Sequence, residues 1–138
     1  MTDASETTSA PDGAVPTKIA LIFRADLTEM TRGKSEIQAA HAGMEHALKV
    51  HNANRQLLLD YMASGQTKVG MEVDDEAQLR RIVDRATARG VPCTLITDAG
   101  RTVFGGPTVT CVMVGPMNKT DNNALTRGAR MRDRERQV

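Results

Sequence analysis

Aromatic side chains are almost absent from this chain of 138 residues, which has no tryptophan, one tyrosine and two phenylalanines. Proteins that bind single-stranded nucleic acid by stacking its bases need exposed aromatic rings, so the composition argues against that mode of binding. The sequence also lacks any run near the roughly 18 apolar residues that a membrane-spanning helix requires. Residues 1–16 contain no lysine, no arginine and no apolar segment, which is not the pattern of a secretory signal. We therefore expect a cytoplasmic protein with no membrane partner.

Cysteine is scarce too, and neither Cys93 nor Cys111 has a CxxC neighbour. Two cysteines in apolar, β-branched surroundings are typical of reduced, buried side chains rather than of a disulfide. His46 and His51 do not stand near cysteine at a spacing that binds zinc. The GxxxxGK[ST], GxSxG and HExxH motifs are absent, and no GxGxxG follows the first apolar run. These absences exclude the most recognisable nucleotide-binding, serine-hydrolase and zinc-protease classes.

What is present fits one globular domain, with 40% hydrophobic and 25% charged residues. The net charge of +1 is unevenly distributed. Residues 1–16 carry a net charge of −3, and residues 127–138 carry five arginines against two acids, a net charge of +3. We predict a disordered leader over residues 1–16, a domain over residues 17–126 and an Arg-rich flexible tail over residues 127–138. The tail fits either a frayed, solvated end or a salt-sensitive RNA contact.

Hydrophobic periodicity predicts strands that alternate with helices. The apolar run at residues 19–23 is typical of a buried central strand. Helical spacing predicts that the helix over residues 33–51 buries a face containing Ile37, His41, Met44 and Leu48. Further elements are predicted as helices near residues 57–65, 75–90 and 122–126 and as strands over residues 67–73, 92–97 and 108–114.

This order predicts a three-layer α/β/α fold with a four-stranded mixed sheet. The connection over residues 98–107 is too short for a helical crossover, so we expect the last strand to run antiparallel. Ligands of open α/β sheets bind beyond the carboxyl ends of the strands. Two polar segments leave such ends, and both are candidate sites.

The first candidate segment leads into the first helix. Lys34 falls in the first helical turn, where free backbone N–H groups attract anions. Arg32 precedes it, and Gly33 allows a close approach to the backbone. Basic groups oppose the helix dipole at this end, so the cluster of Lys34 with Gln38 and His41 on one face favours a functional role. His41 by itself also fits a hydrogen-bonded core histidine.

The second candidate segment follows the third predicted strand directly. Asp98 at the end of that strand can order a water molecule, and Gly100 permits a positive φ in the turn. Arg101 is suited to pairing with Asp98 or binding phosphate, and Thr102 adds a hydroxyl donor. An Asx turn with a structural Asp–Arg pair fits the same residues equally well.

Both segments resemble the motifs of the type-2 peptidyl-tRNA hydrolases. Residues 32–42 read RGKSEIQAAHA, where that family has a basic residue, Gly-Lys, then Gln and His-Ala. Residues 98–102 read DAGRT, and Thr108-Val109-Thr110 and Gly115-Pro116 follow as they do in that family. The resemblance covers roughly residues 18–126.

The resemblance implies hydrolysis of the ester between a peptide and the 3′ ribose of tRNA, with peptidyl-tRNA as the partner and no metal or organic cofactor. A homodimer is left open. Asp98 is then expected to orient water or act as a general base, and Lys34 to stabilise an oxyanion or bind the 3′ phosphate. Carried over by motif, the catalytic residues are Lys34, Gln38, His41, Asp98 and Thr102, and the substrate-binding residues are Arg32, Gly33, Arg101, Thr108 and Thr110.

Two departures from the family pattern keep alternatives open. Ser35-Glu36 stand where the family has small apolar residues, and the Arg-rich tail replaces a closing Leu-Lys-Leu segment. A non-catalytic RNA-binding relative with the same fold fits these departures, as does an unrelated phosphate-binding α/β module. The hydrolase hypothesis and these alternatives predict different effects for variants of Lys34 and Asp98.

Overall fold

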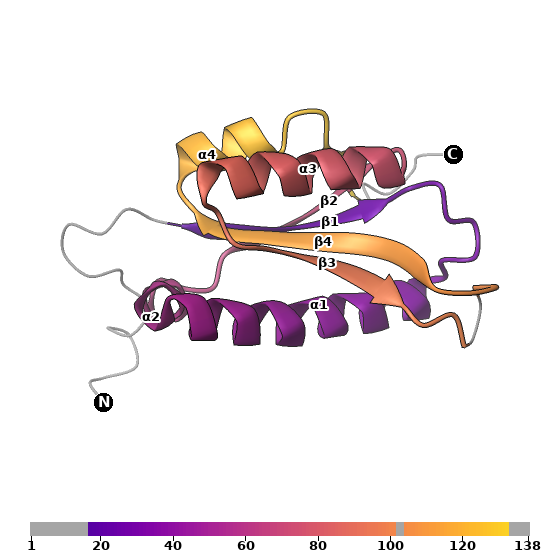
Figure 1. Cartoon of the computed structure of the whole chain (residues 1–138), viewed down its shortest axis with the longest axis horizontal. Helices are drawn as coiled ribbons and strands as arrows, with labels where there is room; N and C mark the ends of the chain where they lie inside the picture. Colours follow the sequence, from indigo (N-terminus) through magenta and orange to yellow (C-terminus); the bar gives the residue numbers. More distant parts are fainter. Residues whose placement is uncertain (1–16, 102–103, 133–138) are drawn as a thin grey trace.

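A computed structural model describes residues 17–101 and 104–132. Its strands form one mixed sheet in the order β3-β4-β1-β2-β5 (Figure 1). β1 and β2 are parallel, whereas β4 runs antiparallel to both of its neighbours, β1 and β3, as the short 98–107 connection predicts. The strand bounds are Lys18–Arg24 for β1, Lys68–Val73 for β2, Cys93–Asp98 for β3, Thr108–Met117 for β4 and Arg130–Met131 for β5.

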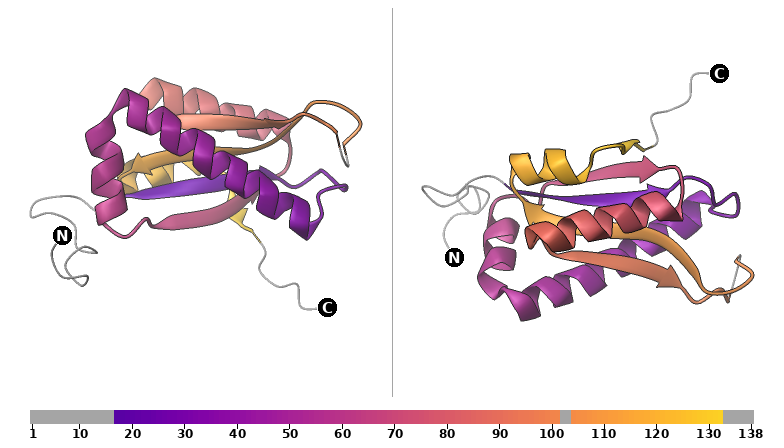
Figure 2. Two further views of the ribbon diagram at one scale, coloured as in Figure 1. Left: turned by 90° about the horizontal axis from the view of Figure 1, so that it is seen from below. Right: turned by 45° about the horizontal axis from the view of Figure 1, so that its top comes forward.

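The helices lie on both sides of this sheet, with α1 and α2 on one side and α3 and α4 on the other (Figures 1 and 2). Their bounds are Arg32–Ala53 for α1, Arg55–Ala63 for α2, Glu76–Arg89 for α3 and Lys119–Leu125 for α4. The core divides accordingly, because successive residues of β1 point to opposite faces. Ala20 and Ile22 join the cluster under α3, and Ile19 and Phe23 join the cluster under α1. The predicted buried central strand is thus confirmed.

The sheet has five strands rather than the four predicted. The additional strand, β5, lies within the segment predicted to be a flexible tail, and it pairs antiparallel with β2. The Arg130 guanidinium donates to the Glu72 carboxylate at 3.0 Å and to the Asp74 carboxylate at 2.7 Å. The sheet therefore extends to residue 131, beyond residue 126, where the predicted domain ends. The predicted leader and residues 133–138 of the predicted tail lie outside the described residues.

The buried face of α1 also differs from the prediction. Ile37, Met44 and Leu48 are 52%, 78% and 63% exposed. The helix instead buries Gln38, Ala42, His46 and Val50. His46 is the core histidine of this helix: its ring nitrogens lie 2.8 Å from Thr94 Oγ1 and 2.7 Å from the Gly115 carbonyl oxygen. Polar side chains with such partners can occupy a core face without leaving buried groups unpaired.

Candidate active site

Asp98, the last residue of β3, is held by groups from two segments of the chain. Its side chain is 10% exposed, and the Lys34 Nζ atom lies 2.9 Å from Oδ1. Gln38 Nε2 donates to the same oxygen at 2.9 Å, and the Gly100 backbone N–H donates to Oδ2 at 2.7 Å. Gly100 has a φ of +80°, and a Cβ atom there would meet the Gly106 backbone at 2.2 Å. This turn therefore requires glycine, as the DAGRT motif predicts.

These contacts stabilise the ionised form of the carboxylate. The hydrogen bond from Lys34 is the largest cause that lowers the pKa of Asp98, and the bonds from Gly100 and Gln38 act in the same direction against the effect of burial. A carboxylate with a lowered pKa keeps its charge and accepts hydrogen bonds at neutral pH. It is also a weak proton acceptor, so the geometry favours orientation of a water molecule over removal of its proton.

Gln38 connects Asp98 to the interior of the sheet. Its side chain is fully buried, and its Oε1 atom accepts a hydrogen bond of 2.7 Å from Thr110 Oγ1. The threonine hydroxyl thus fixes the amide so that its NH₂ group faces Asp98. Thr110, predicted to bind substrate, is itself fully buried on β4, where its hydroxyl donates to Gln38. The hydrogen bonds between Thr110, Gln38 and Asp98 thus link β4, α1 and β3.

Lys34 is positioned by the start of α1. Thr31 caps this helix, and its hydroxyl accepts the Lys34 backbone N–H at 3.1 Å. The Lys34 side chain is 14% exposed, and its ammonium lies 5.6 Å from the centre of the Phe104 ring. A cation over an aromatic face is electrostatically favourable, so Phe104 helps to hold the ammonium beside Asp98.

A pocket of about 330 Å³ opens beside this cluster, between α1 and the end of β3. His41 lines it and is exposed, so His41 belongs to the pocket and not to the core. Arg101 lies at the same pocket, and among the described residues it has no acidic partner, so the predicted pair with Asp98 is not formed there. The complete lining is Lys34, His41, Glu45, Thr97, Asp98, Ala99 and Arg101.

The other predicted residues lie outside this cluster. The Arg32 side chain is 94% exposed and lies 3.5 Å from the Glu36 carboxylate, which therefore faces solvent rather than the pocket. Gly33 has no atom of the described residues within 4 Å of the position of a Cβ, so no close approach by that part of the chain requires glycine there. Thr108 is the ladder partner of Asp98, but its hydroxyl donates to the Gly106 carbonyl at 2.8 Å. Thr102 lies outside the described residues.

Motif reasoning missed Glu45, Phe104, Thr97 and Ala99. Glu45 follows His41 by one helical turn on the same side of α1, and that spacing was a usable signal. Phe104 stands in a Gly-rich loop whose path no periodicity specifies, so its contact with Lys34 had no signal in the sequence. Thr97 and Ala99 line the pocket through their position on either side of Asp98.

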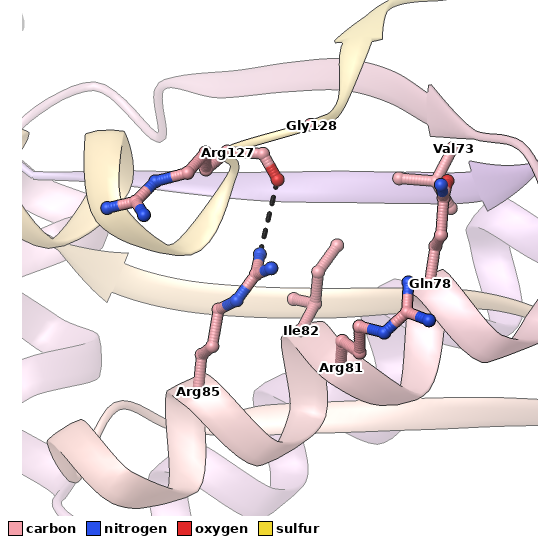
Figure 3. A pocket seen from close by; sticks show the side chains of 7 residues that line it. All are labelled: Val73, Gln78, Arg81, Ile82, Arg85, Arg127 and Gly128. Carbon is pink, nitrogen blue, oxygen red and sulfur yellow. Dashed lines mark hydrogen bonds between the residues drawn. The ribbon is translucent and has the colours of Figure 1, made fainter.

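A second pocket, of about 80 Å³, lies between α3 and the segment that follows α4 (Figure 3). Its lining contains no carboxylate, and there Arg85 donates to the Arg127 carbonyl at 3.2 Å. It therefore lacks an acidic group that could orient water. Within residues 17–101 and 104–132, no three His, Cys, Asp or Glu side chains gather where they could hold a metal ion, and no helix is long and apolar enough to cross a membrane.

Comparison with known proteins agrees with the fold and the motifs. The family model of peptidyl-tRNA hydrolase PTH2 matches residues 17–131. A peptidyl-tRNA hydrolase of Methanococcus maripaludis strain C6 is 32% identical over 112 residues, which cover 81% of this chain and 96% of the relative. A peptidyl-tRNA hydrolase of Methanocaldococcus jannaschii is 35% identical over 99 residues, which cover 72% of this chain and 85% of the relative.

Among solved structures, a protein of unknown function from Agrobacterium tumefaciens shares the fold. Its TM-score is 0.53 at 19% identity, and the match covers 86% of this chain and 98% of that one. The fold and the paired Asp98 define an α/β domain with a charged site at the ends of its strands. The chain belongs to the PTH2 family of peptidyl-tRNA hydrolases, and the resemblance at residues 32–42 and 98–102 is thereby confirmed.

Proposed function

We propose that this protein hydrolyses the ester bond between the peptide and the 3′ ribose of tRNA, and so recycles peptidyl-tRNA in the cytoplasm without a metal ion. The observation that carries the proposal is the Asp98 carboxylate, held by Lys34 and Gln38 at a pocket within the family's two motifs. Relatives named peptidyl-tRNA hydrolase support the same reaction.

The contacts of Asp98 fit a reaction in which this carboxylate orients the attacking water. The water oxygen attacks the ester carbonyl carbon, and negative charge develops on the carbonyl oxygen. We assign the Lys34 ammonium, 2.9 Å from Asp98, to the stabilisation of that charge. His41 lines the same pocket, and we assign it the transfer of a proton from the water to the departing 3′ oxygen. Gln38 and Thr110 are positioning residues, because both are buried and act through Asp98.

The cationic groups around the start of α1 fit the RNA part of the substrate. Arg101 lies at the pocket, and the exposed Arg32 stands in the first turn of the same helix as Lys34. Arginine binds phosphate through two parallel hydrogen bonds, so we assign both arginines to phosphates near the 3′ end. Gly33, Thr102 and Thr108 remain proposed site residues whose contacts depend on the bound substrate.

The test is release of the N-acetyl-aminoacyl group from tRNA by the purified protein and by Asp98→Asn and Lys34→Met. We expect each variant to lower kcat by a factor of about 10² or more, the scale of a lost acid–base or oxyanion group. Arg80→Met is a matched control, because it removes the Arg80–Glu76 ion pair from α3. Circular dichroism establishes whether each variant is folded.

Two results would contradict the proposal. Unchanged release by folded Asp98→Asn would remove Asp98 from the reaction. Binding of tRNA without any release by the wild-type protein would indicate the RNA-binding relative with the same fold.

A further inference from the structure

Three apolar side chains on α1 are exposed to solvent and belong to neither core cluster of the described residues. We refer to Ile37, Met44 and Leu48 as the α1 stripe; they are 52%, 78% and 63% exposed. Together with His41, which lines the pocket, they follow helical spacing along one flank of α1. Contiguous exposed apolar residues mark binding surfaces more often than isolated ones do. The stripe is therefore continuous with the candidate active site.

The strand beside α1 has a free edge. Among the strands of residues 17–101 and 104–132, β3 lies at the edge of the sheet and pairs with β4 alone, so its outer side presents backbone groups that no described strand binds. α1 runs alongside β3 in the opposite direction: Lys34 bonds Asp98 at one end, and the Lys49 ammonium donates to the Cys93 carbonyl at the other. An extended peptide can add to such an edge through main-chain hydrogen bonds, which tolerate many side chains.

The charges indicate which part of the substrate lies where. Lys34, Arg32 and Arg101 place positive charge at the start of α1 and beside Asp98. Glu45 lines the same pocket about 16 Å further along the helix, and its carboxylate repels phosphate. The RNA is thus favoured at the Lys34 end, and the uncharged part of the substrate is favoured on the side of Glu45.

The length of α1 agrees with this placement of the RNA and the peptide. Lys34 and Leu48 are separated by about 21 Å along α1, at 1.5 Å per residue. An extended peptide advances about 3.3 Å per residue, so this distance corresponds to about six residues. The ester lies at the carboxyl end of the peptide, beside Asp98, which is also the carboxyl end of β3. A peptide that runs back along the edge is therefore parallel to β3.

We propose that the peptide part of the substrate lies between α1 and the edge of β3, parallel to β3, with its apolar side chains against the α1 stripe. The proposal rests on the proposed function and extends it from the ester to the peptide. A second copy of this chain is a less suitable occupant, because a stable dimer uses about 20–30 residues on each side, and the stripe supplies three large apolar side chains.

The experiment compares three substrates with one tRNA: N-acetylglycyl-tRNA, the same ester extended by three leucines, and the same ester extended by three serines. The variant is the double substitution Met44→Ser/Leu48→Ser. We expect its KM for the leucine substrate to rise about tenfold with kcat unchanged, since the contact serves binding and not the chemical step. Its KM for N-acetylglycyl-tRNA should not change.

The matched control is Leu59→Ser/Met62→Ser on α2, where the two side chains are 40% and 46% exposed and do not line the pocket. This variant should leave all three KM values unchanged. A second readout is hydrogen exchange of the amides of residues 94–98. We expect it to slow when the wild-type protein binds a leucine-extended analogue that has an amide in place of the ester.

Each of the other possible results contradicts one part of the proposal. No release of N-acetylglycine by the wild-type protein means that the proposed function fails. If the wild-type protein releases N-acetylglycine but Met44→Ser/Leu48→Ser raises the KM equally for the leucine substrate and for N-acetylglycyl-tRNA, the stripe does not bind peptide. The same conclusion follows if the variant changes neither KM. Unslowed exchange in β3 overturns the addition to its edge. Light scattering that shows a dimer in the wild type and a monomer in the stripe variant assigns the stripe to a second copy.

Discussion

At the scale of single residues, the site depends on how its neighbours set the charge of Asp98. The pKa of this carboxyl is lowered chiefly by Lys34, so the ionised form is more stable in the folded than in the unfolded chain. The resulting contribution to stability is present above the unfolded pKa of about 3.9 and is lost as the pH falls through the lower folded pKa. Neutral solution thus keeps the carboxylate charged.

Replacement of Lys34 should move this titration. In Lys34→Met the largest cause of the lowered pKa is removed while burial remains, so we expect the pKa of Asp98 to rise. The measurement is a carbon-13 NMR titration of the Asp98 carboxyl in the wild type and the variant. Arg80→Met should leave the titration unchanged. An Asp98 pKa that does not move in Lys34→Met would show that the ion pair does not set its charge.

The motif residues of this site could be predicted from sequence, but their roles could not. Lys34, Gln38 and Asp98 meet as expected because they occupy fixed places in two recognisable motifs. Thr110 stands in a third motif, and its buried hydroxyl donates to Gln38 inside the sheet. Whether a polar residue is buried depends on partners from distant segments, which spacing along the chain does not reveal. The contact between Lys34 and Phe104 is hidden for the same reason.

At the scale of elements, α1 shows why hydrophobic spacing identified the helix but not its buried face. Ile37, Met44 and Leu48 define one helical face, and Gln38, Ala42 and His46 define another that is less apolar. The second face is buried because its polar groups find partners on β3 and β4. An apolar face that the spacing predicts to be buried is therefore exposed, and it is the face that we propose to bind the peptide.

The short strand β5 was missed because two residues carry no detectable period. It changes how the Arg-rich end can be tested. A deletion of residues 127–138 removes β5 and also Ala129, which packs against the core cluster under α3. A loss of tRNA binding in that deletion would therefore have two causes, the removal of arginines and the removal of β5.

Two truncations separate these effects. We expect removal of residues 127–138 to lower the free energy of unfolding by about 1–3 kcal/mol, the usual size of lost packing. Removal of residues 133–138 alone should leave it unchanged, because β5 remains. Urea unfolding followed by circular dichroism provides the measurement. Equal stability of the two truncated proteins would show that β5 adds nothing to the fold.

At the scale of the whole molecule, the alternation of strands and helices predicted a mixed sheet with an antiparallel strand. The place of β4 between β1 and β3 could not be read from the order of elements, since several arrangements satisfy the same connections. That arrangement leaves β3 at the edge and puts the end of β1, the end of β3 and the start of α1 at one end of the molecule (Figure 2). The positive groups of the site gather at this end.

With a net charge of only +1, the chain as a whole attracts RNA weakly, so the positions of individual arginines decide where tRNA binds. Each phosphate contact with a single strand adds about 0.7 to the slope of log affinity against log salt. Arg32→Ala/Arg101→Ala should therefore flatten that slope by about 1.4 if both arginines bind the single-stranded 3′ end. The measurement is tRNA binding by the Asp98→Asn variant, which prevents turnover, over a series of salt concentrations.

The control is Arg81→Ala/Arg85→Ala, which removes the same charge from the second pocket, between α3 and the segment after α4 (Figure 3). The Asp98 site lies at the pocket beside α1, and α3 covers the opposite face of the sheet. We therefore expect the control to keep the wild-type slope. If instead the control flattens the slope and Arg32→Ala/Arg101→Ala does not, the tRNA crosses the α3 face, and the phosphate contacts assigned to Arg32 and Arg101 are wrong.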